Sequence, residues 1–431
     1  MVLARMALTN YRGFASRQAI ELRPITVVLG RNNAGKSALV RAPVILAGGI
    51  DTDSQEPVDI DKISEELLES FADLIHGGPA GESRIGVEVA VRADGLSRLV
   101  ASIRHLPQQH REVVESLELF EAGTSKGRLE RISGIPETDR FPIYKAHIDG
   151  RVLQSAVEFQ GLLPHRLIDE PVAGEALVGV SRRIRNNYPV IRYLGPFRDR
   201  PHRRYRLPGR TRTEVGATGE HAAGILAGDR AWDGGRLIRL VNDAMTGHLP
   251  GWRVDAVDRH GTWAIVLTST ADPSVRVNLA DTGTGIAQML PIFVQRAIDQ
   301  VRPSQRPVLE IVEQPELHLH PAAHAMLADL YLEAVRKTST RFLIETHSET
   351  FLLRLRRRIA EGSLGAEPTT VAVHFVDRAD GTSVVRPIHI DADGNVDYWP
   401  EGVFTEDYDE TRALVRAQRG RRVEDAGRDR S

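Results

Sequence analysis

The sequence predicts an α/β protein: a largely parallel sheet covered by helices, with an antiparallel β lobe and further helices inserted between its two halves. Near the N-terminus, an apolar, β-rich run over residues 18–29 ends at a Gly/Asn cluster, and a helical pattern follows it. After residue 275, short apolar runs alternate with amphipathic stretches, as strands and helices do in a parallel sheet. Between residues 84 and 150, short alternating runs are separated by Gly, Pro and Asp, which indicates antiparallel strands.

The individual elements follow from these patterns. In the N-terminal half we expect a strand within 18–29 and a helix from Lys36 to Leu46. The middle of the chain should carry helices within 166–187 and 219–248, and a hairpin over 252–270 that turns at 258–261. In the C-terminal half we expect strands over 275–280, 307–312 and 341–346, alternating with helices over 286–301, 321–336 and 348–361.

These elements divide the chain into five parts. The parallel-sheet domain, called the head below, is built from two parts of the chain. Its N-terminal part (1–90) precedes an inserted β and helical lobe (91–190). A basic segment with helices and a hairpin (191–275) then leads into the C-terminal part of the head (276–418). The last residues, 419–431, are charged and poor in apolar side chains, so we expect them to be disordered.

The composition excludes several classes of protein. With 41% hydrophobic and 26% charged residues, the 431-residue chain can bury a core, which argues against global disorder. The 56 basic and 58 acidic residues leave a net charge of −2, so any attraction to nucleic acid must be local. The lack of cysteine excludes disulfides, thiolate zinc sites and iron–sulfur clusters. Without a signal-like N-terminus or a long apolar run, we expect a cytoplasmic protein.

Residues 30–37, GRNNAGKS, fit the pattern G-x4-G-K-[ST] between a predicted strand and a predicted helix. Glycines let backbone N–H groups converge on phosphates, and the helix N-terminus adds its positive dipole end. Lys36 would reach the outer phosphates, and the Ser37 hydroxyl would bind Mg²⁺. Only five lysines occur among 56 basic residues, so a lysine at this position stands out. The predicted nucleotide-binding residues here are Gly30, Asn32, Asn33, Ala34, Gly35, Lys36, Ser37 and Ala38.

The second half of such a site needs an acid at the end of a neighbouring strand and a group that orients water. Glu313 ends one apolar strand, and Glu316 follows shortly after Pro315. His347 follows the next apolar strand, at the edge where ligands bind in open α/β sheets, and could bond a γ-phosphate. Residues 281–288, DTGTGIAQ, precede a helix and could form a second anion-binding surface, although a tight turn also explains them.

In this order, these motifs resemble the ABC-type ATPase heads related to SMC and RecF proteins. Within that group the chain is most similar to the OLD-like (overcoming lysogenisation defect) AAA-family ATPases of bacteria. The resemblance covers about residues 1–50 and 190–400, and residues 90–190 contribute nothing to it. The phrases that carry it are LTNYRGF, ITVVLGRNNAGKS, YLGPFR, VGATGE, QMLPI, PELHLHP and ETHS.

The resemblance implies an ABC-type P-loop head that uses ATP and Mg²⁺. Glu313 takes the Walker B position and would bind the metal together with Ser37, and His347 takes the switch-histidine position. Residues 282–285 take the place of the signature motif, which in such heads touches the γ-phosphate of the partner subunit. This implies ATP sandwiched between two heads, hence at least a homodimer, with Thr284 and Gly285 at the shared nucleotide.

One departure from the family pattern concerns catalysis. ABC-type heads follow the Walker B acid with a glutamate that polarises the attacking water, but here that position is Gln314. An amide cannot act as a general base. Either Glu316 fills the role, or hydrolysis is slow and the protein is mainly an ATP-gated clamp. Glu316 could also be an unrelated loop acid.

Three further features have alternative explanations. Eight arginines interleaved with aromatic residues could contact nucleic acid, pair with local acids or contact the nucleotide itself: Arg192, Arg198, Arg200, Arg203, Arg204, Arg206, Arg210 and Arg212. His318, His320 and His324 could bind zinc, but the family pattern places them beside the dimer-facing loop. Asp391 and Asp393 resemble a nuclease D-x-D, although a hairpin turn fits the segment better.

The resemblance therefore implies a Mg²⁺-dependent ATPase without a nuclease domain of its own. Its expected role is antiviral defence beside a separately encoded nuclease or toxin, which is an analogy because a fold does not fix a function. Two alternatives remain open: a RecF/SMC-like DNA-binding clamp in repair, and an ATP-locked regulatory scaffold that hydrolyses little.

Overall fold

The computed structural model describes residues 2–78, 83–92, 95–132, 141–210, 212–246, 251–400 and 412–414. The expected disorder of 419–431 lies outside the described residues. No helix within the described ranges is long and apolar enough to span a bilayer.

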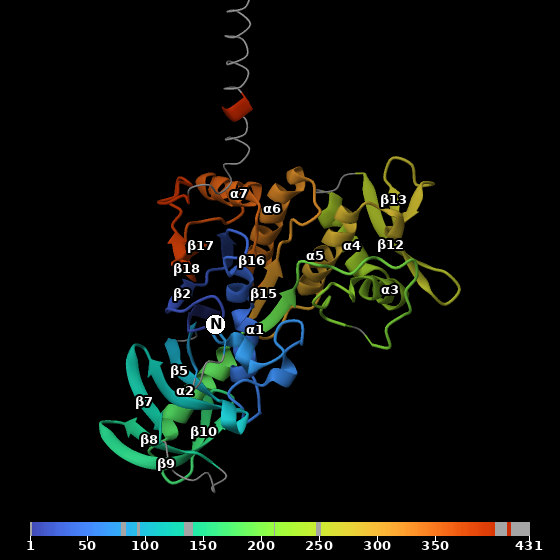
Figure 1. Cartoon of the computed structure of the whole chain (residues 1–431). Helices are drawn as coiled ribbons and strands as arrows, with labels where there is room; N and C mark the ends of the chain where they lie inside the picture. Colours follow the sequence, from blue (N-terminus) through green and yellow to red (C-terminus); the bar gives the residue numbers. More distant parts are fainter. Residues whose placement is uncertain are drawn as a thin grey trace, which may run out of the picture.

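A six-stranded sheet forms the centre of the molecule, in the order β11-β15-β16-β3-β17-β18 (Figure 1). The first five strands are parallel, and β18 runs antiparallel to β17. The strands are β3 (Ile25–Gly30), β11 (Val190–Leu194), β15 (Val308–Glu313), β16 (Thr340–Glu345), β17 (Val371–Ala379) and β18 (Thr382–Ile388). Because both faces are covered, β15 is buried at every position, which explains its continuous apolar run.

Two separate apolar cores lie on the two faces of this sheet. On one face, α1 (Lys36–Ile50) packs between the parallel sheet and the antiparallel lobe. On the other face lie α5 (Thr284–Val301), α6 (Pro321–Lys337) and α7 (Glu349–Ala360). The predicted fold class is confirmed: a P-loop head with a largely parallel sheet, flanking helices and an antiparallel lobe.

The antiparallel lobe is a nine-stranded sheet in the order β10-β9-β8-β7-β6-β5-β4-β1-β2. Helix α2 (Glu175–Asn187) packs on it. Short 3₁₀ helices occur at Ile60–Lys62, Phe71–Leu74, Pro107–Gln109 and Leu279–Asp281. The strands are β1 (Val2–Thr9), β2 (Gln18–Glu21), β4 (Arg84–Arg92), β5 (Leu96–Leu106), β6 (Arg111–Glu121), β7 (Thr124–Arg131), β8 (Ile143–Ile148), β9 (Arg151–Gln160) and β10 (Leu163–Leu167).

Two expectations about the N-terminal part differ from the structure. The single strand expected within 18–29 is two strands in different sheets, because Pro24 interrupts the run and lacks an N–H for a ladder. The expected border at residue 90 falls inside β4 (Arg84–Arg92), since β1 and β2 join the same antiparallel sheet as β4. That pairing is long-range, and the local pattern does not reveal it.

A third region, which we call the arm, extends from the central sheet on the side away from the antiparallel lobe (Figure 1). It contains α3 (Ala222–Trp232), α4 (Arg236–Thr246) and a three-stranded sheet of β12 (Trp252–Asp258), β13 (Trp263–Ser269) and β14 (Arg276–Asn278). The helical stretch expected within 219–248 is divided into α3 and α4, because Gly234 and Gly235 between them both have positive φ. The strand expected over 275–280 is shorter and pairs with the hairpin rather than with the parallel sheet.

Candidate functional site

The predicted phosphate-binding loop joins β3 to α1 and is held closely against β17. Gly30 has φ 153° and Gly35 has φ 98°, values that favour glycine. A Cβ atom at Gly30 would lie 2.1 Å from the carbonyl oxygen of Val376, so no larger residue fits there. The loop therefore takes the conformation in which backbone N–H groups at the start of α1 can bind an anion.

The Lys36 side chain folds back across this loop. Its Nζ donates hydrogen bonds to the carbonyl oxygens of Gly30 (3.0 Å) and Arg31 (2.7 Å). Burial lowers the pKa of Lys36, and the nearby Glu345 carboxylate opposes that shift. A phosphate at the loop would offer this ammonium stronger, charged acceptors than the two carbonyls.

Two carboxylates end neighbouring strands beside the loop. Glu313 on β15 and Glu345 on β16 are register partners, and both are buried. Arg41 of α1 donates two hydrogen bonds to Glu313, from Nε (2.6 Å) and Nη2 (2.7 Å), and the Tyr193 hydroxyl donates a third at 3.0 Å. The predicted metal-binding acid is therefore held by a guanidinium from the helix that follows the P-loop.

The second carboxylate contacts the predicted metal-binding serine directly. Ser37 Oγ donates to Glu345 Oε1 at 3.1 Å. The other oxygen, Oε2, is buried and has no hydrogen-bond partner within the described residues. Burial, reinforced by the charge of Glu313, raises the pKa of Glu345 to about 7. The sequence-based site set omitted Glu345, although its position two residues before His347 at a strand end was a usable signal.

These oxygens suit Mg²⁺, a hard cation that prefers carboxylate and hydroxyl ligands. Ser37 and Glu345 are in contact, and the unpaired Oε2 of Glu345 leaves a buried oxygen for a cation to satisfy. Glu313 could take part only after Arg41 released it. The residues present therefore fit the metal, with Glu345 placed nearer to Ser37 than the expected acid.

The loop after β15 is strained and tied to its neighbours. Gln314 has φ 44°, an uncommon value for a residue other than glycine, and its N–H donates to the Glu345 carbonyl oxygen at 2.7 Å. The buried guanidinium of Arg198 lies 3.4 Å from the carbonyl oxygen of Glu313 and 3.5 Å from that of Gln314. Among the arginines that could contact nucleic acid, local acids or the nucleotide, Arg198 therefore lies at this loop and not on the surface.

Glu316 links the loop after β15 to the loop after β16. Its Oε1 accepts the backbone N–H of His347 at 2.6 Å, and its Oε2 is buried without a partner in the described part of the chain. The His347 ring is exposed, yet local desolvation and the Lys36 ammonium lower its pKa. The structure thus places Lys36, Ser37, Glu313, Gln314, Glu316 and His347 around the ends of β15 and β16, and their roles in the site remain predictions.

The signature segment lies beside the same loop. Thr284 and Gly285 begin α5, and a Cβ atom at Gly285 would lie 3.5 Å from the carbonyl oxygen of His318. The N-cap residue, Gly283, supplies no side-chain acceptor, so N–H groups of the first turn remain for a ligand. A buried ion pair between Arg296 and Glu310 ties α5 to β15.

The histidine cluster has structural partners. His324 Nδ1 lies 2.9 Å from Ser348 Oγ, and His320 caps α6 by accepting the Ala322 N–H. No group of three or more metal-ligating side chains is found among the residues that the structure describes. Asp391 accepts the N–H groups of Asp393 and Asn395, so this segment forms the expected hairpin turn.

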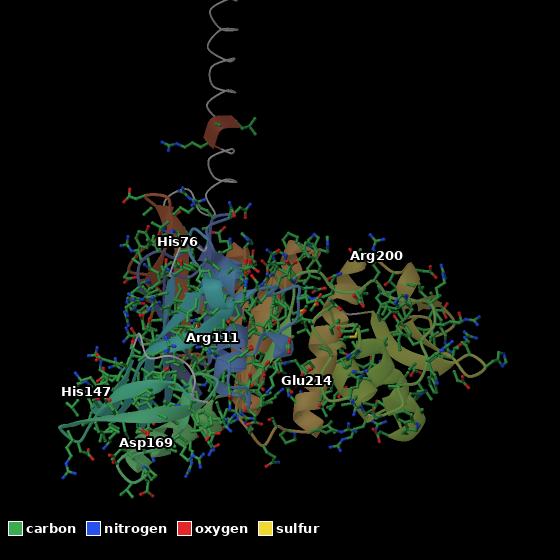
Figure 2. All side chains as sticks on the ribbon, turned by 60° about the horizontal axis from the view of Figure 1, so that its bottom comes forward. His76, Arg111, His147, Asp169, Arg200 and Glu214 are labelled. Atoms are coloured by element: carbon green, nitrogen blue, oxygen red, sulfur yellow. The ribbon has the colours of Figure 1, made fainter. Side chains whose placement is uncertain are left out.

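The arginine-rich segment divides into paired and exposed residues. Arg192 pairs with Asp299 at 2.5 Å, Arg203 pairs with Asp281, and Arg212 contacts His221. The exposed remainder consists of Arg200, Arg204, Arg206 and Arg210. Phe197 joins them with 78% of its surface exposed. Figure 2 shows Arg200 away from His147 and Asp169 of the antiparallel lobe, with Glu214 between them.

Comparison with protein families identifies the C-terminal half of the site. Residues 261–352, which include the predicted signature, Walker B and switch positions, match the family model described as the AAA ATPase domain. Residues 367–414 match a family described as a protein of unknown function (DUF3696). This match confirms the predicted resemblance to ATPases, and the OLD-like subtype remains a prediction. A search of curated proteins returned no match.

Several solved structures are similar in arrangement. The SMC head domain from Thermotoga maritima shares 12% identity, with 90% of this chain and 100% of that chain covered and a TM-score of 0.45. An SmcHead bound to the C-winged helix domain of ScpA shares 13% identity, at 90% and 98% coverage and a TM-score of 0.46. An Smc head domain with an extended coiled coil, bound to the C-terminal domain of ScpA derived from Pyrococcus furiosus, shares 10% identity, at 90% and 96% coverage and a TM-score of 0.46.

Proposed function

We propose that this chain, whose residues 261–352 belong to an AAA ATPase domain, is a Mg²⁺-dependent ATPase of the ABC/OLD-like type. The observation that carries the proposal is the 3.1 Å hydrogen bond between Ser37, in the GKS loop, and the buried Glu345. A metal–nucleotide site needs a hydroxyl and a carboxylate together beside the phosphate loop, and this contact supplies both.

The residues of the loop and the strand ends have separable roles in this proposal. Lys36 exchanges its two carbonyl partners for phosphate oxygens, and His347, kept neutral by its lowered pKa, bonds the γ-phosphate through its ring N–H. Bound Mg²⁺ would neutralise charge on the transferred phosphoryl group. Ser37 and Glu345 would hold the metal, and Arg41 keeps Glu313 occupied until the nucleotide arrives.

The attacking water is positioned by groups that favour slow turnover. The Gln314 amide can hydrogen-bond a water but cannot remove its proton. Glu316 keeps one buried oxygen without a partner among the described residues, next to the His347 backbone, which supports a role as the acid that orients water. Glu316→Gln should therefore lower kcat while ATP binding persists, and an unchanged kcat would leave Glu313 or the partner head as the source of the base.

A second head is part of the proposal. Thr284 and Gly285 present an open helix N-terminus, and anions bind such N–H groups well. We infer that ATP held on one head is completed by these residues of another copy, which gives a homodimer at least. Binding would join or reorder the heads, and hydrolysis would reset them.

The biological role we propose is antiviral defence with a separately encoded nuclease or toxin. It rests on the motif resemblance, together with the turn geometry of Asp391 and Asp393, which leaves that pair without a nuclease arrangement. The exposed arginine surface (Arg200, Arg204, Arg206, Arg210) supports the alternative of a DNA-binding clamp, because no acid of the described chain pairs with these four side chains.

The deciding experiment is steady-state phosphate release with Mg²⁺-ATP, with and without double-stranded DNA. Lys36→Ala should lower turnover by about 100-fold or more, because a phosphate-binding charge is lost. The matched control is Lys337→Ala, since Lys337 pairs with Glu333 on the surface of α6. Wild-type turnover in Lys36→Ala would overturn the P-loop assignment. Stimulation by DNA would favour the clamp, and tight ATP binding with negligible turnover would favour the scaffold.

A further inference from the structure

A pocket lies at the amino ends of the parallel strands, at the opposite edge of the sheet from the phosphate-binding loop. It has a volume of about 670 Å³, which falls within the range of small-molecule sites, roughly 300–1,000 Å³. Its walls include Arg23, which lies just before β3, Arg341, which is the second residue of β16, and the first residues of β17. Residues of β1, β2, β4 and β5 close the other side, so the pocket spans the junction of the two large sheets.

The lining of this pocket is strongly basic. Five guanidinium groups and two imidazoles face one carboxylate, that of Glu21, which is 61% exposed and 3.4 Å from Arg23. Glu88, an acid on β4 outside the lining, is bound by Arg17 at 2.5 and 2.8 Å and also interacts electrostatically with Arg98 and Arg5. The basic lining residues are Arg5, Arg23, Arg92, Arg98, Arg341, His374 and His389.

Two of these arginines lie close enough to oppose each other. Burial lowers the pKa of Arg341, and the positive charge of Arg92 lowers it further. Within the described residues, neither side chain forms an ion pair with a carboxylate. An anion bound between Arg92 and Arg341 would compensate these two like charges, for which the described residues supply no paired carboxylate.

Two further groups give the pocket a defined shape. The Arg98 guanidinium lies 4.0 Å from the centroid of the Phe120 ring, which fixes its planar donor face. His374 is 4% exposed; its Nε2 donates to the Glu21 carbonyl oxygen at 2.9 Å, and its Nδ1 has no partner in the described chain. A buried polar atom without a partner is costly, and a hydroxyl or a water carried by a ligand would satisfy it.

We propose that this pocket binds a ligand carrying two or more phosphate groups, which Arg92 and Arg98 contact from the antiparallel sheet and Arg23 and Arg341 from the parallel sheet. Arginine matches phosphate geometry through paired N–H donors. Phosphates of this kind occur on a free small molecule or at the end of a nucleic-acid strand, and both present the same chemistry to the pocket.

The test uses the full chain carrying Lys36→Ala, so that the phosphate-binding loop contributes little. Calorimetric titrations with inorganic pyrophosphate and with 5′-phosphorylated and unphosphorylated oligonucleotides compare this protein with a variant that also carries Arg92→Gln and Arg341→Gln. Exposed Arg259 provides the matched control, Arg259→Gln. We expect the double change to weaken binding about tenfold or more, and the control to leave it unchanged.

The ligands distinguish the two sources of phosphate. Binding of pyrophosphate alone supports a small molecule, and selective binding of the 5′-phosphorylated strand supports a nucleic-acid end. No binding of any ligand, or binding that both arginine substitutions leave intact, would overturn the proposal. Thermal unfolding checks that each variant folds, and Arg98→Gln replaces the double variant if it does not. Because the ATPase readout is not used, failure here is independent of the proposed function.

Discussion

At the carboxyl edge of the parallel sheet, the buried acids receive partners from the chain itself, whereas at the amino edge two arginines, Arg92 and Arg341, form no ion pair with a carboxylate of the described residues. Glu313 is held by Arg41, and Glu345 accepts the Ser37 hydroxyl. At the other edge, Arg341 faces the charge of Arg92. Acids near an unpaired oxygen suit a cation, and clustered arginines suit an anion. The carboxyl edge of this sheet therefore favours a bound cation, and its amino edge favours a bound anion.

The largest effect should come from removing the cation that compensates Glu313. Arg41→Met leaves a buried carboxylate without its bidentate partner, and we expect the free energy of unfolding to fall by about 4 kcal/mol. Urea unfolding measures this change. Adding Glu313→Gln should recover much of the loss, because the orphaned charge is then removed. A loss below about 1 kcal/mol would mean that solvent already screens the pair.

The next effect concerns Glu345, whose pKa is raised to about 7. Because this exceeds the unfolded value of about 4.3, the native state binds the proton more tightly, and the contribution of Glu345 to stability falls as pH rises through that window. Glu345→Gln removes the titration, so its stability relative to wild type should be about 3 kcal/mol higher at pH 8 than at pH 4. Urea unfolding at the two pH values gives the difference. A difference that does not depend on pH would show that Glu345 titrates normally.

A smaller effect tests the missing base at the same edge. Gln314→Glu restores a carboxylate where ABC-type heads carry one, and we expect kcat to rise by about 100-fold, at the lower end of general-base effects. Steady-state phosphate release measures the change, and Lys36→Ala in the same chain should abolish it. An unchanged kcat would indicate that Glu316 already orients the water.

The smallest effect belongs to the amino edge and has the opposite sign to that at Arg41. Arg341→Gln relieves the repulsion from Arg92, so the free energy of unfolding should rise by less than about 1 kcal/mol at low salt. The gain should shrink at high salt, where the charges are screened. Destabilisation at both salt concentrations would show that Arg341 contributes packing or bonding rather than an uncompensated charge.

The sequence identifies what is encoded by short motifs. The GKS loop, the strands that end at Glu313 and Glu345, and the position of His347 follow from local spacing, because P-loop chemistry requires those residues in that order. The fold class also follows, since buried parallel strands produce continuous apolar runs.

Long-range contacts account for what sequence analysis missed. Ser37 and Glu345 are 308 positions apart, and Arg41 is 272 positions from Glu313. The burial of Arg198 in the site depends on a similar contact with the loop after β15. No local pattern distinguishes an arginine that neutralises an acid from one that faces solvent. The boundary of the antiparallel lobe was missed for the same reason, because β1 pairs with β4 across 70 or more positions.

Strand β16 runs from the basic pocket at the amino edge of the parallel sheet to the acidic residues at its carboxyl edge. Arg341 stands near its start in the basic pocket, and Glu345 stands at its end beside Ser37, four residues away, or about 13 Å along an extended chain. Hydrogen-bonded between β15 and β3, the strand has no hinge between these two positions. Because Arg341 and Glu345 lie on one continuous strand, a displacement of β16 along its axis would move both side chains together.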